Sequence, residues 1–210
     1  VAERQEPPYS VLFFPAHGHQ GGMRWMTSGL AMLYRKKHQL LNHNGPSPVD
    51  ITHRRLRYWA RFKQKRICAW ACFALDGHRP VHLFNTHVSL PAFFLRATGN
   101  GTGRFGEVEN QVKEVDRVLS FARTRCGSEP AVLVGDFNAM PGSITYERIV
   151  GSGLFREAFS PNTAASAGLP PSEPTAGLFG LRYRLDHMFC TQRIQPVASG
   201  EPGDTEASLR

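Results

Sequence analysis

Two polar side chains, Asp136 and Asn138, stand two positions apart shortly after an apolar stretch at 132–134. Gly135 separates the stretch from them, and a Pro-Gly turn follows at 141–142. Side chains two positions apart on a strand point to one face, so we expect Asp136 and Asn138 to lie side by side at a strand's carboxyl end. A carboxylate and a carboxamide held together can deprotonate and orient one water, which suits hydrolysis of a phosphate ester.

The periodicity of apolar residues predicts the elements that must position these side chains. Strands are expected at 10–14, 30–34, 67–75, 81–86, 131–134 and 185–190. Apolar residues recur at helical spacing over 106–125, with Glu and Lys opposite them, and a shorter helix is expected at 143–150 with Ser143 as its N-cap. The stretches expected to be loops are 16–22, 42–48, 98–106 and 161–180. Strands alternating with helices, without a clean linker, predict one α/β domain over residues 1–210.

Two further polar groups accompany predicted strands. Asn85-Thr86-His87 ends the strand at 81–86, and Arg184-Leu185-Asp186-His187 opens the strand at 185–190. A single histidine or aspartate in such a place is more often structural than catalytic. Three such groups at the ends of three strands in one chain are much harder to explain by structural roles alone.

These motifs together resemble those of the endonuclease/exonuclease/phosphatase superfamily, the metal-dependent phosphoesterases related to DNase I. The matching motifs are N-T-H at 85–87, G-D-F-N-A-M-P-G-S at 135–143, R-L-D-H at 184–187 and the early strand S-G-L-A-M-L-Y-R at 28–35. The resemblance covers roughly residues 9 to 195 and is most specific in G-D-F-N. It implies an α/β (α+β) fold, a four-layer sandwich of two packed mixed β-sheets with outer helices.

The resemblance also implies roles for four residues. Asp136 would orient or deprotonate the attacking water and ligate a metal ion, and Asn138 would hold that water or a phosphate oxygen. His87 would donate a hydrogen bond to the phosphoryl group. Asp186 would orient a catalytic histidine, as the acid of a triad does. The implied cofactor is Mg2+ or Mn2+, which oxygen ligands suit.

Three elements of the family's pattern are not matched in this sequence, the first being an early strand that bears a functional Asn. The family has a "Q-E" whose Glu is the main metal ligand, but no apolar strand precedes Gln5-Glu6, so Glu6 is only a weak candidate. The family's terminal "S-D-H" would be expected to follow about where Arg210 stands. We therefore expect a chain shortened at both ends, lacking terminal strands and hydrolysing little. We expect His187 to be a packing position rather than a substitute for the missing histidine, because it faces away from Asp186.

Positive charge is concentrated in one segment of the chain. The formal net charge is +8, and seven of the 25 Lys and Arg residues lie between positions 54 and 66, interleaved with three aromatic residues. We expect Arg54, Arg55 and Arg57 to bind the substrate, because such segments suit polyanions. Nucleic acid, DNA or RNA, is slightly favoured. A lipid, inositol or other small-molecule phosphate ester and a non-catalytic phosphate-binding module stay open as alternatives, and an anionic lipid headgroup would also suit the charge.

Composition sets the remaining expectations. No apolar run approaches the roughly 20 residues of a transmembrane helix, so a soluble protein of unassigned compartment is expected. The four cysteines show no zinc spacing and are expected to be reduced and mostly buried. We expect a monomer.

Overall fold

The computed structural model of the chain describes residues 8–17, 28–53, 65–75, 79–90, 109–158, 174–178 and 181–196. Its largest element is a seven-stranded sheet in the order β3-β5-β6-β7-β11-β8, with β4 paired beside β5. The strands are β3 (Gln39–His43), β4 (Val49–Asp50), β5 (Ile67–Ala74), β6 (Pro80–His87), β7 (Ala131–Asp136), β8 (Arg156–Glu157) and β11 (Asp186–Cys190). β6 and β7 are parallel, and the other pairs described in this sheet are antiparallel.

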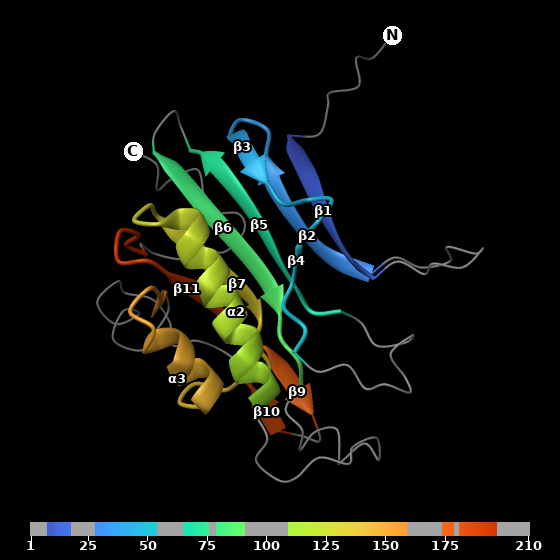
Figure 1. Cartoon of the computed structure of the whole chain (residues 1–210), viewed down its shortest axis with the longest axis vertical. Helices are drawn as coiled ribbons and strands as arrows, with labels where there is room; N and C mark the ends of the chain where they lie inside the picture. The colour runs from blue at the N-terminus through green and yellow to red at the C-terminus, as the bar shows by residue number, and fades with distance from the viewer. Residues whose placement is uncertain are drawn as a thin grey trace, which may run out of the picture.

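The connection between the two parallel strands is the long helix of the fold. A parallel pair needs a crossover, and α2 (Glu109–Cys126) supplies it between β6 and β7. Figure 1 shows α2 lying across the large sheet, with α3 (Ile144–Val150) beside it. The α2 helix ends at Cys126 because Gly127 follows with φ 52°, a left-handed conformation that glycine adopts readily.

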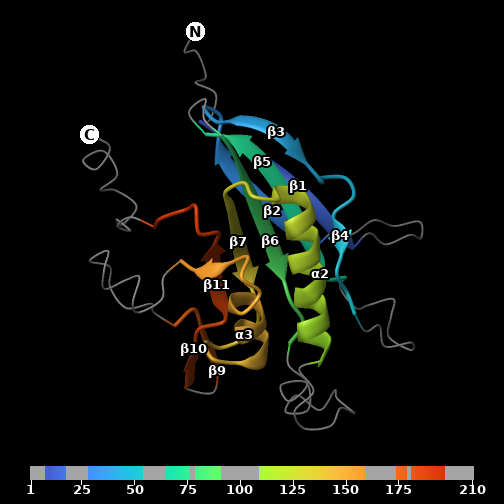
Figure 2. The same ribbon diagram turned by 60° about the vertical axis from the view of Figure 1, so that its left-hand side comes forward.

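Two smaller antiparallel hairpins complete the described structure. β1 (Tyr9–His17) pairs with β2 (Ser28–Arg35), and β9 (Ala176–Leu178) pairs with β10 (Leu181–Tyr183). The β1–β2 hairpin packs on the face of the large sheet opposite α2, where β2 contacts β5 and β6 (Figure 2). The fold is therefore an α/β arrangement of packed sheets with helices outside.

Strand β5 is buried on both faces, and the two cores of the molecule lie on either side of it. Cys68, Trp70 and Cys72 face α2 in the larger core, which also contains Phe84 and Leu133. The alternate β5 residues belong to the second core, under the β1–β2 hairpin, where the buried members are Phe14, Ala16, Met32, Ile67, Ala69, Ala71 and Phe73. An almost continuous apolar run is the sequence pattern of a strand covered on both faces.

The predicted elements correspond to observed ones with small shifts at their ends. The six predicted strands are β1, β2, β5, β6, β7 and β11, and the two predicted helices are α2 and α3. The short strands β3, β4, β8, β9 and β10 were not predicted, and β9 falls within the expected loop at 161–180. The fold class is confirmed.

One outer surface of the described structure is not covered by helices. Tyr9, Val11 and Phe13 of β1 and Leu33 of β2 are exposed on the side of the hairpin that faces away from the large sheet. Both described helices instead lie on the large sheet. Neither of these helices is long and apolar enough to cross a membrane.

Candidate active site

Three of the predicted site residues form a row across three neighbouring strands. In the parallel β6–β7 pair His87 is the register partner of Asp136, and in the antiparallel β11–β7 pair Asp186 is the partner of the same Asp136. Directly opposite residues on adjacent strands project to one face with Cβ atoms about 5 Å apart. The sheet therefore places one imidazole and two carboxylates side by side at the carboxyl end of β6 and β7.

The row lies on the face of the large sheet that also carries the β1–β2 hairpin. The residues at alternate positions of these strands, such as Phe84 and Leu133, point to the opposite face of the sheet, into the core under α2. His87 Nε2 lies 3.5 Å from Asp136 Oδ2, and their side chains are 39% and 36% exposed. The site is therefore open to solvent and to a ligand, unlike the apolar core on the opposite face.

The electrostatic surroundings of His87 favour its neutral form. Burial lowers the pKa of His87 from its usual value, and the positive charge of Arg66 lowers it further, while Asp136 and Asp186 oppose the shift. A neutral imidazole can donate one N–H and accept at its other nitrogen. His87 can thus serve as a hydrogen-bond donor beside the two carboxylates.

Arg66 is a site residue that the sequence reasoning missed. It directly precedes β5, is half-buried, and lies close enough to Glu114 and Asp136 that both raise its pKa, against the larger lowering effect of burial. Arg66 is the last cation of the basic segment and directly precedes a buried strand, a signal that could have identified it. A guanidinium here adds positive charge to a site that otherwise carries two carboxylates.

Asn138 differs from the expectation that placed it beside Asp136 on one strand face. β7 ends at Asp136, and Asn138 has φ 48°, which turns the chain into the left-handed region. Its backbone N–H donates to Asp136 Oδ1 at 2.9 Å, and its Nδ2 donates to the Val88 carbonyl at 2.9 Å. The residue is buried, and it ties the loop after β7 to the loop after β6. Its role in holding a water or a phosphate oxygen stays a prediction.

Two buried polar side chains of α2 support these loops. Glu114 accepts hydrogen bonds from the backbone N–H and hydroxyl of Ser89, both at 2.8 Å, and from the His53 N–H at 3.4 Å. Gln111 donates to the Ser89 and Asn138 carbonyls. The expectation that the Glu and Lys residues of this helix lie on an exposed face is wrong for Glu114, because it is buried and its carboxylate accepts hydrogen bonds from Ser89 and His53.

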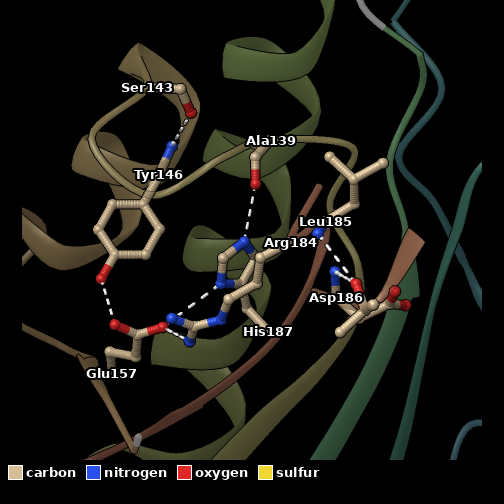
Figure 3. A network of polar contacts seen from close by, with 9 residues as sticks. Ala139, Ser143, Tyr146, Glu157, Arg184, Leu185, Asp186 and His187 are labelled. Atoms are coloured by element: carbon tan, nitrogen blue, oxygen red, sulfur yellow. Dashed lines mark hydrogen bonds and ion pairs between the residues drawn. The ribbon is translucent and has the colours of Figure 1, made fainter. Parts of the chain in front are cut away.

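His187 faces away from Asp186, as expected, and packs among aromatic side chains on the α3 side of the sheet. Its ring contacts Phe137, Tyr146 and Phe189. It also makes a hydrogen bond that the sequence reasoning did not foresee, from Nε2 to the Ala139 carbonyl at 2.7 Å (Figure 3). Burial lowers the pKa of His187, partly opposed by that hydrogen bond.

The donor chemistry at the site fits a small divalent cation. Among the described residues, no three His, Cys, Asp or Glu side chains converge as a complete metal site. Mg2+, however, commonly takes one or two carboxylates and fills its other positions with water and substrate phosphate. The adjacent Asp136 and Asp186 offer that set. The residues present are therefore suited to Mg2+ or Mn2+ rather than to a cysteine-bound metal.

Several predicted site residues lie outside the described residues. These are Arg54, Arg55 and Arg57 of the basic segment and the weak metal-ligand candidate Glu6.

Comparisons with known proteins agree with this fold. The sequence profile of the Endonuclease/Exonuclease/phosphatase family matches residues 2–208. The human Nocturnin catalytic domain, solved with a bound sulfate anion, is 16% identical with a TM-score of 0.61, covering 88% of this chain and 61% of that chain. The mannosyl-6-phosphatase Bt3783 of Bacteroides thetaiotaomicron VPI-5482 is 17% identical with a TM-score of 0.59, covering 91% and 66%. ANGEL2, a 2',3'-cyclic phosphatase solved with adenosine-2',3'-vanadate, is 14% identical with a TM-score of 0.52, covering 88% and 63%.

At these identities the structural likeness establishes the fold. This chain spans between three fifths and two thirds of the length of those three structures. A search of the curated proteins finds no match.

The fold and the site define an α/β protein of packed sheets with a histidine–carboxylate row at the carboxyl edge of two parallel strands. The chain belongs to the endonuclease/exonuclease/phosphatase family.

Proposed function

We propose that this chain carries the catalytic core of a Mg2+-dependent phosphoesterase. The observation that supports this most is the register of β6, β7 and β11, which aligns His87, Asp136 and Asp186 on one open face. Membership of a family named for nucleases and phosphatases agrees with it. The structural relatives also support the proposal. Nocturnin was solved with a bound sulfate anion, Bt3783 is a mannosyl-6-phosphatase, and ANGEL2 is a 2',3'-cyclic phosphatase.

Each side chain in the row has a role in the proposed reaction. Asp136 accepts a proton from the attacking water and orients it, and the neutral imidazole of His87 donates to a phosphoryl oxygen where charge develops. The charges of Asp186 and Asp136 oppose the lowering of the pKa of His87, and Asp136 Oδ2 lies 3.5 Å from its Nε2. Arg66 attracts the phosphate, because a guanidinium matches phosphate oxygens in geometry and charge.

Asp136 and Asp186 would hold the cation. When bound, Mg2+ polarises the phosphate and stabilises the leaving oxygen. The proton acceptor and the phosphoryl donor remain groups of the chain itself.

The experiment combines phosphate binding with hydrolysis. Mg2+-dependent binding of inorganic vanadate is measured by calorimetry, and turnover is measured on bis-p-nitrophenyl phosphate and p-nitrophenyl phosphate. We expect Asp136→Asn to weaken both by about 100-fold, since it removes a group that acts in the transition state. Asp116→Asn is the matched control, because Asp116 pairs with Arg148 on the α2 surface and is expected to leave both unchanged.

The outcomes separate the function classes. Turnover that needs Mg2+ and Asp136, even if slow, supports the proposal. Vanadate binding without turnover favours the alternative of a non-catalytic phosphate-binding module. Neither binding nor turnover, or turnover indifferent to Asp136, overturns the assignment of this site.

The substrate class is tested through the basic segment. Binding of an RNA or DNA oligonucleotide is compared with binding of vesicles carrying phosphatidylinositol phosphate, between 50 and 200 mM salt. We expect oligonucleotide affinity to fall by roughly tenfold or more across this range if several phosphates are contacted, and to fall again in the variant Arg54→Glu/Arg55→Glu/Arg57→Glu. The control carries the same charge changes at the exposed residues Lys36, Lys37 and Arg193. Vesicle binding without oligonucleotide binding favours the lipid alternative.

A further inference from the structure

Two consecutive backbone carbonyls in the loop after β7 are held by buried side chains from different elements. Gln111 of α2 donates from Nε2 to the Asn138 carbonyl at 3.0 Å. His187 of β11 donates from Nε2 to the Ala139 carbonyl at 2.7 Å (Figure 3). We call these two side chains the carbonyl clamp. Only 2% of Gln111 and 5% of His187 is exposed, so neither hydrogen bond competes with bulk water.

The amide of Gln111 is fixed at both of its polar atoms. Its Nε2 also donates to the Ser89 carbonyl at 2.8 Å, and its Oε1 accepts from the Thr145 hydroxyl at 3.1 Å. Two carbonyls on one side and a hydroxyl donor on the other assign the amide nitrogen and oxygen without ambiguity. Gln111 thereby joins the loop after β6, the loop after β7 and the first turn of α3.

The imidazole of His187 is held through one of its nitrogens. A carbonyl cannot donate, so Nε2 must carry the proton that reaches Ala139. Nδ1 lies 3.4 Å from Glu157 Oε1, and Glu157 also accepts from Arg184 and, at 2.5 Å, from the Tyr146 hydroxyl. Figure 3 shows these groups converging on the Glu157 carboxylate. Arg184 and Tyr146 thus supply the donors to Glu157, and the Ala139 carbonyl is the acceptor that fixes the tautomer of the His187 ring.

The clamped residues control the shape of the site. Asn138 has φ 48°, a conformation that non-glycine residues rarely adopt and that persists where the surroundings impose it. In this conformation its N–H donates to Asp136 Oδ1. Release of the Asn138 and Ala139 carbonyls would let the loop leave this conformation, and the Asp136 carboxylate would lose the donor that orients it.

We propose that Gln111 and His187 are positioning residues, whose carbonyl clamp holds the loop of residues 137–140 so that Asp136 faces His87 in a reactive arrangement. This rests on the proposed function of the Asp136 site. Neither side chain belongs to the row itself, so each acts through the backbone of the loop.

Hydrogen exchange at the Asn138 amide, followed by NMR, tests the clamp without substrate or metal. His187→Gln keeps a donor where Nε2 stood, because the glutamine amide reaches that far, whereas His187→Asn reaches only the place of Nδ1. Gln111→Met keeps the length of the side chain and removes its donor. The amide of Leu133, in the middle of β7, reports global unfolding in every variant.

The expected results follow from the value of a buried hydrogen bond. Exchange at Asn138 should become about tenfold faster or more in His187→Asn and Gln111→Met, relative to Leu133, and stay within about threefold of wild type in His187→Gln. The control His82→Asn truncates a similarly buried histidine at the other end of β6, where it contacts Trp70 and Glu129, and should leave Asn138 unchanged.

Two results would overturn the clamp: wild-type exchange at Asn138 in His187→Asn, or equally fast exchange in His187→Gln and His187→Asn. If Gln111→Met does not fold, the His187 pair alone decides. In the hydrolysis assay, kcat should fall about tenfold in His187→Asn with KM changed less than about threefold, and His187→Gln should restore it; equal changes in both variants count against the proposal. Because exchange needs neither ligand nor turnover, the clamp and the phosphoesterase assignment can fail separately.

Discussion

At Gly135, β7 approaches β6 too closely for any side chain. The φ of Gly135 is 149°, and a Cβ built there would lie 1.9 Å from the Thr86 carbonyl oxygen. That contact is with backbone, which cannot move aside without shifting the strand. The glycine thus allows His87 and Asp136, which follow Thr86 and Gly135 directly, to lie as register partners.

We therefore predict that Gly135→Ala destabilises the protein by about 3 kcal/mol or more, from backbone overlap and an unfavourable φ together. Gly127→Ala is the control: Gly127 also has a positive φ, but nothing lies within 4 Å of its Cβ position, so a loss of about 1 kcal/mol is expected. Urea denaturation measures both. An equal loss of unfolding free energy in the two variants would show that backbone conformation alone, without the Thr86 contact, accounts for a glycine at position 135.

At the residue scale the sequence predicted the members of the row but not their supports. His87, Asp136 and Asp186 come together because each ends or begins a strand, and strand ends can be identified from apolar patterns. Asn138 was misplaced because strand alternation was extended beyond Asp136, where a positive φ ends it. Gln111 was missed because polar residues on a surface helix are ordinarily solvated.

Helix α3 depends on its N-cap more than α2 does, because it has only seven residues. Ser143 has extended backbone, and its hydroxyl accepts from the Tyr146 N–H at 3.3 Å. The first turn of α3 also carries Thr145, which donates to Gln111. Loss of the cap therefore affects both the helix and one side of the carbonyl clamp.

We predict that Ser143→Ala lowers the free energy of unfolding by about 1 kcal/mol, and that Ser143→Asp restores most of it, because aspartate also caps helices and its charge favours the helix N-terminus. Urea denaturation curves of the three proteins measure this. The reverse order, with Ala more stable than Asp, would mean that the hydroxyl does not act as a cap.

At the element scale, long elements were predictable and short ones were not. The apolar spacing of α2 and the continuous apolar run of β5 are strong signals. β4 and β8 have two residues each, too few for any period to be seen in the sequence. They exist because longer neighbours, β5 and β11, present edges for them to pair with, which is a tertiary effect.

The whole molecule buries its four cysteines, and none of them is paired in a disulfide. Cys68, Cys72, Cys126 and Cys190 are all free, and at most 6% of any of them is exposed. Three belong to the core under α2, and Cys190 lies on β11. This confirms the expectation of free, buried thiols, and it makes their reactivity a measure of how far the molecule opens.

Burial raises the pKa of all four thiols above its usual value. A thiol with a raised pKa stays protonated at pH 8, whereas the thiolate is the reactive form. The protonation of these cysteines and their burial therefore both slow their reaction. We predict no rapid reaction of the native chain with Ellman's reagent and four equivalents in 6 M guanidinium chloride. Ser120→Cys, on the exposed side of α2, supplies a matched accessible thiol that should react at least about 100-fold faster than the native four, because their reaction requires opening of the core. A native thiol that reacts as fast as the introduced one would place that cysteine outside a closed core, and for Cys68 or Cys72 it would contradict the packing of β5 against α2.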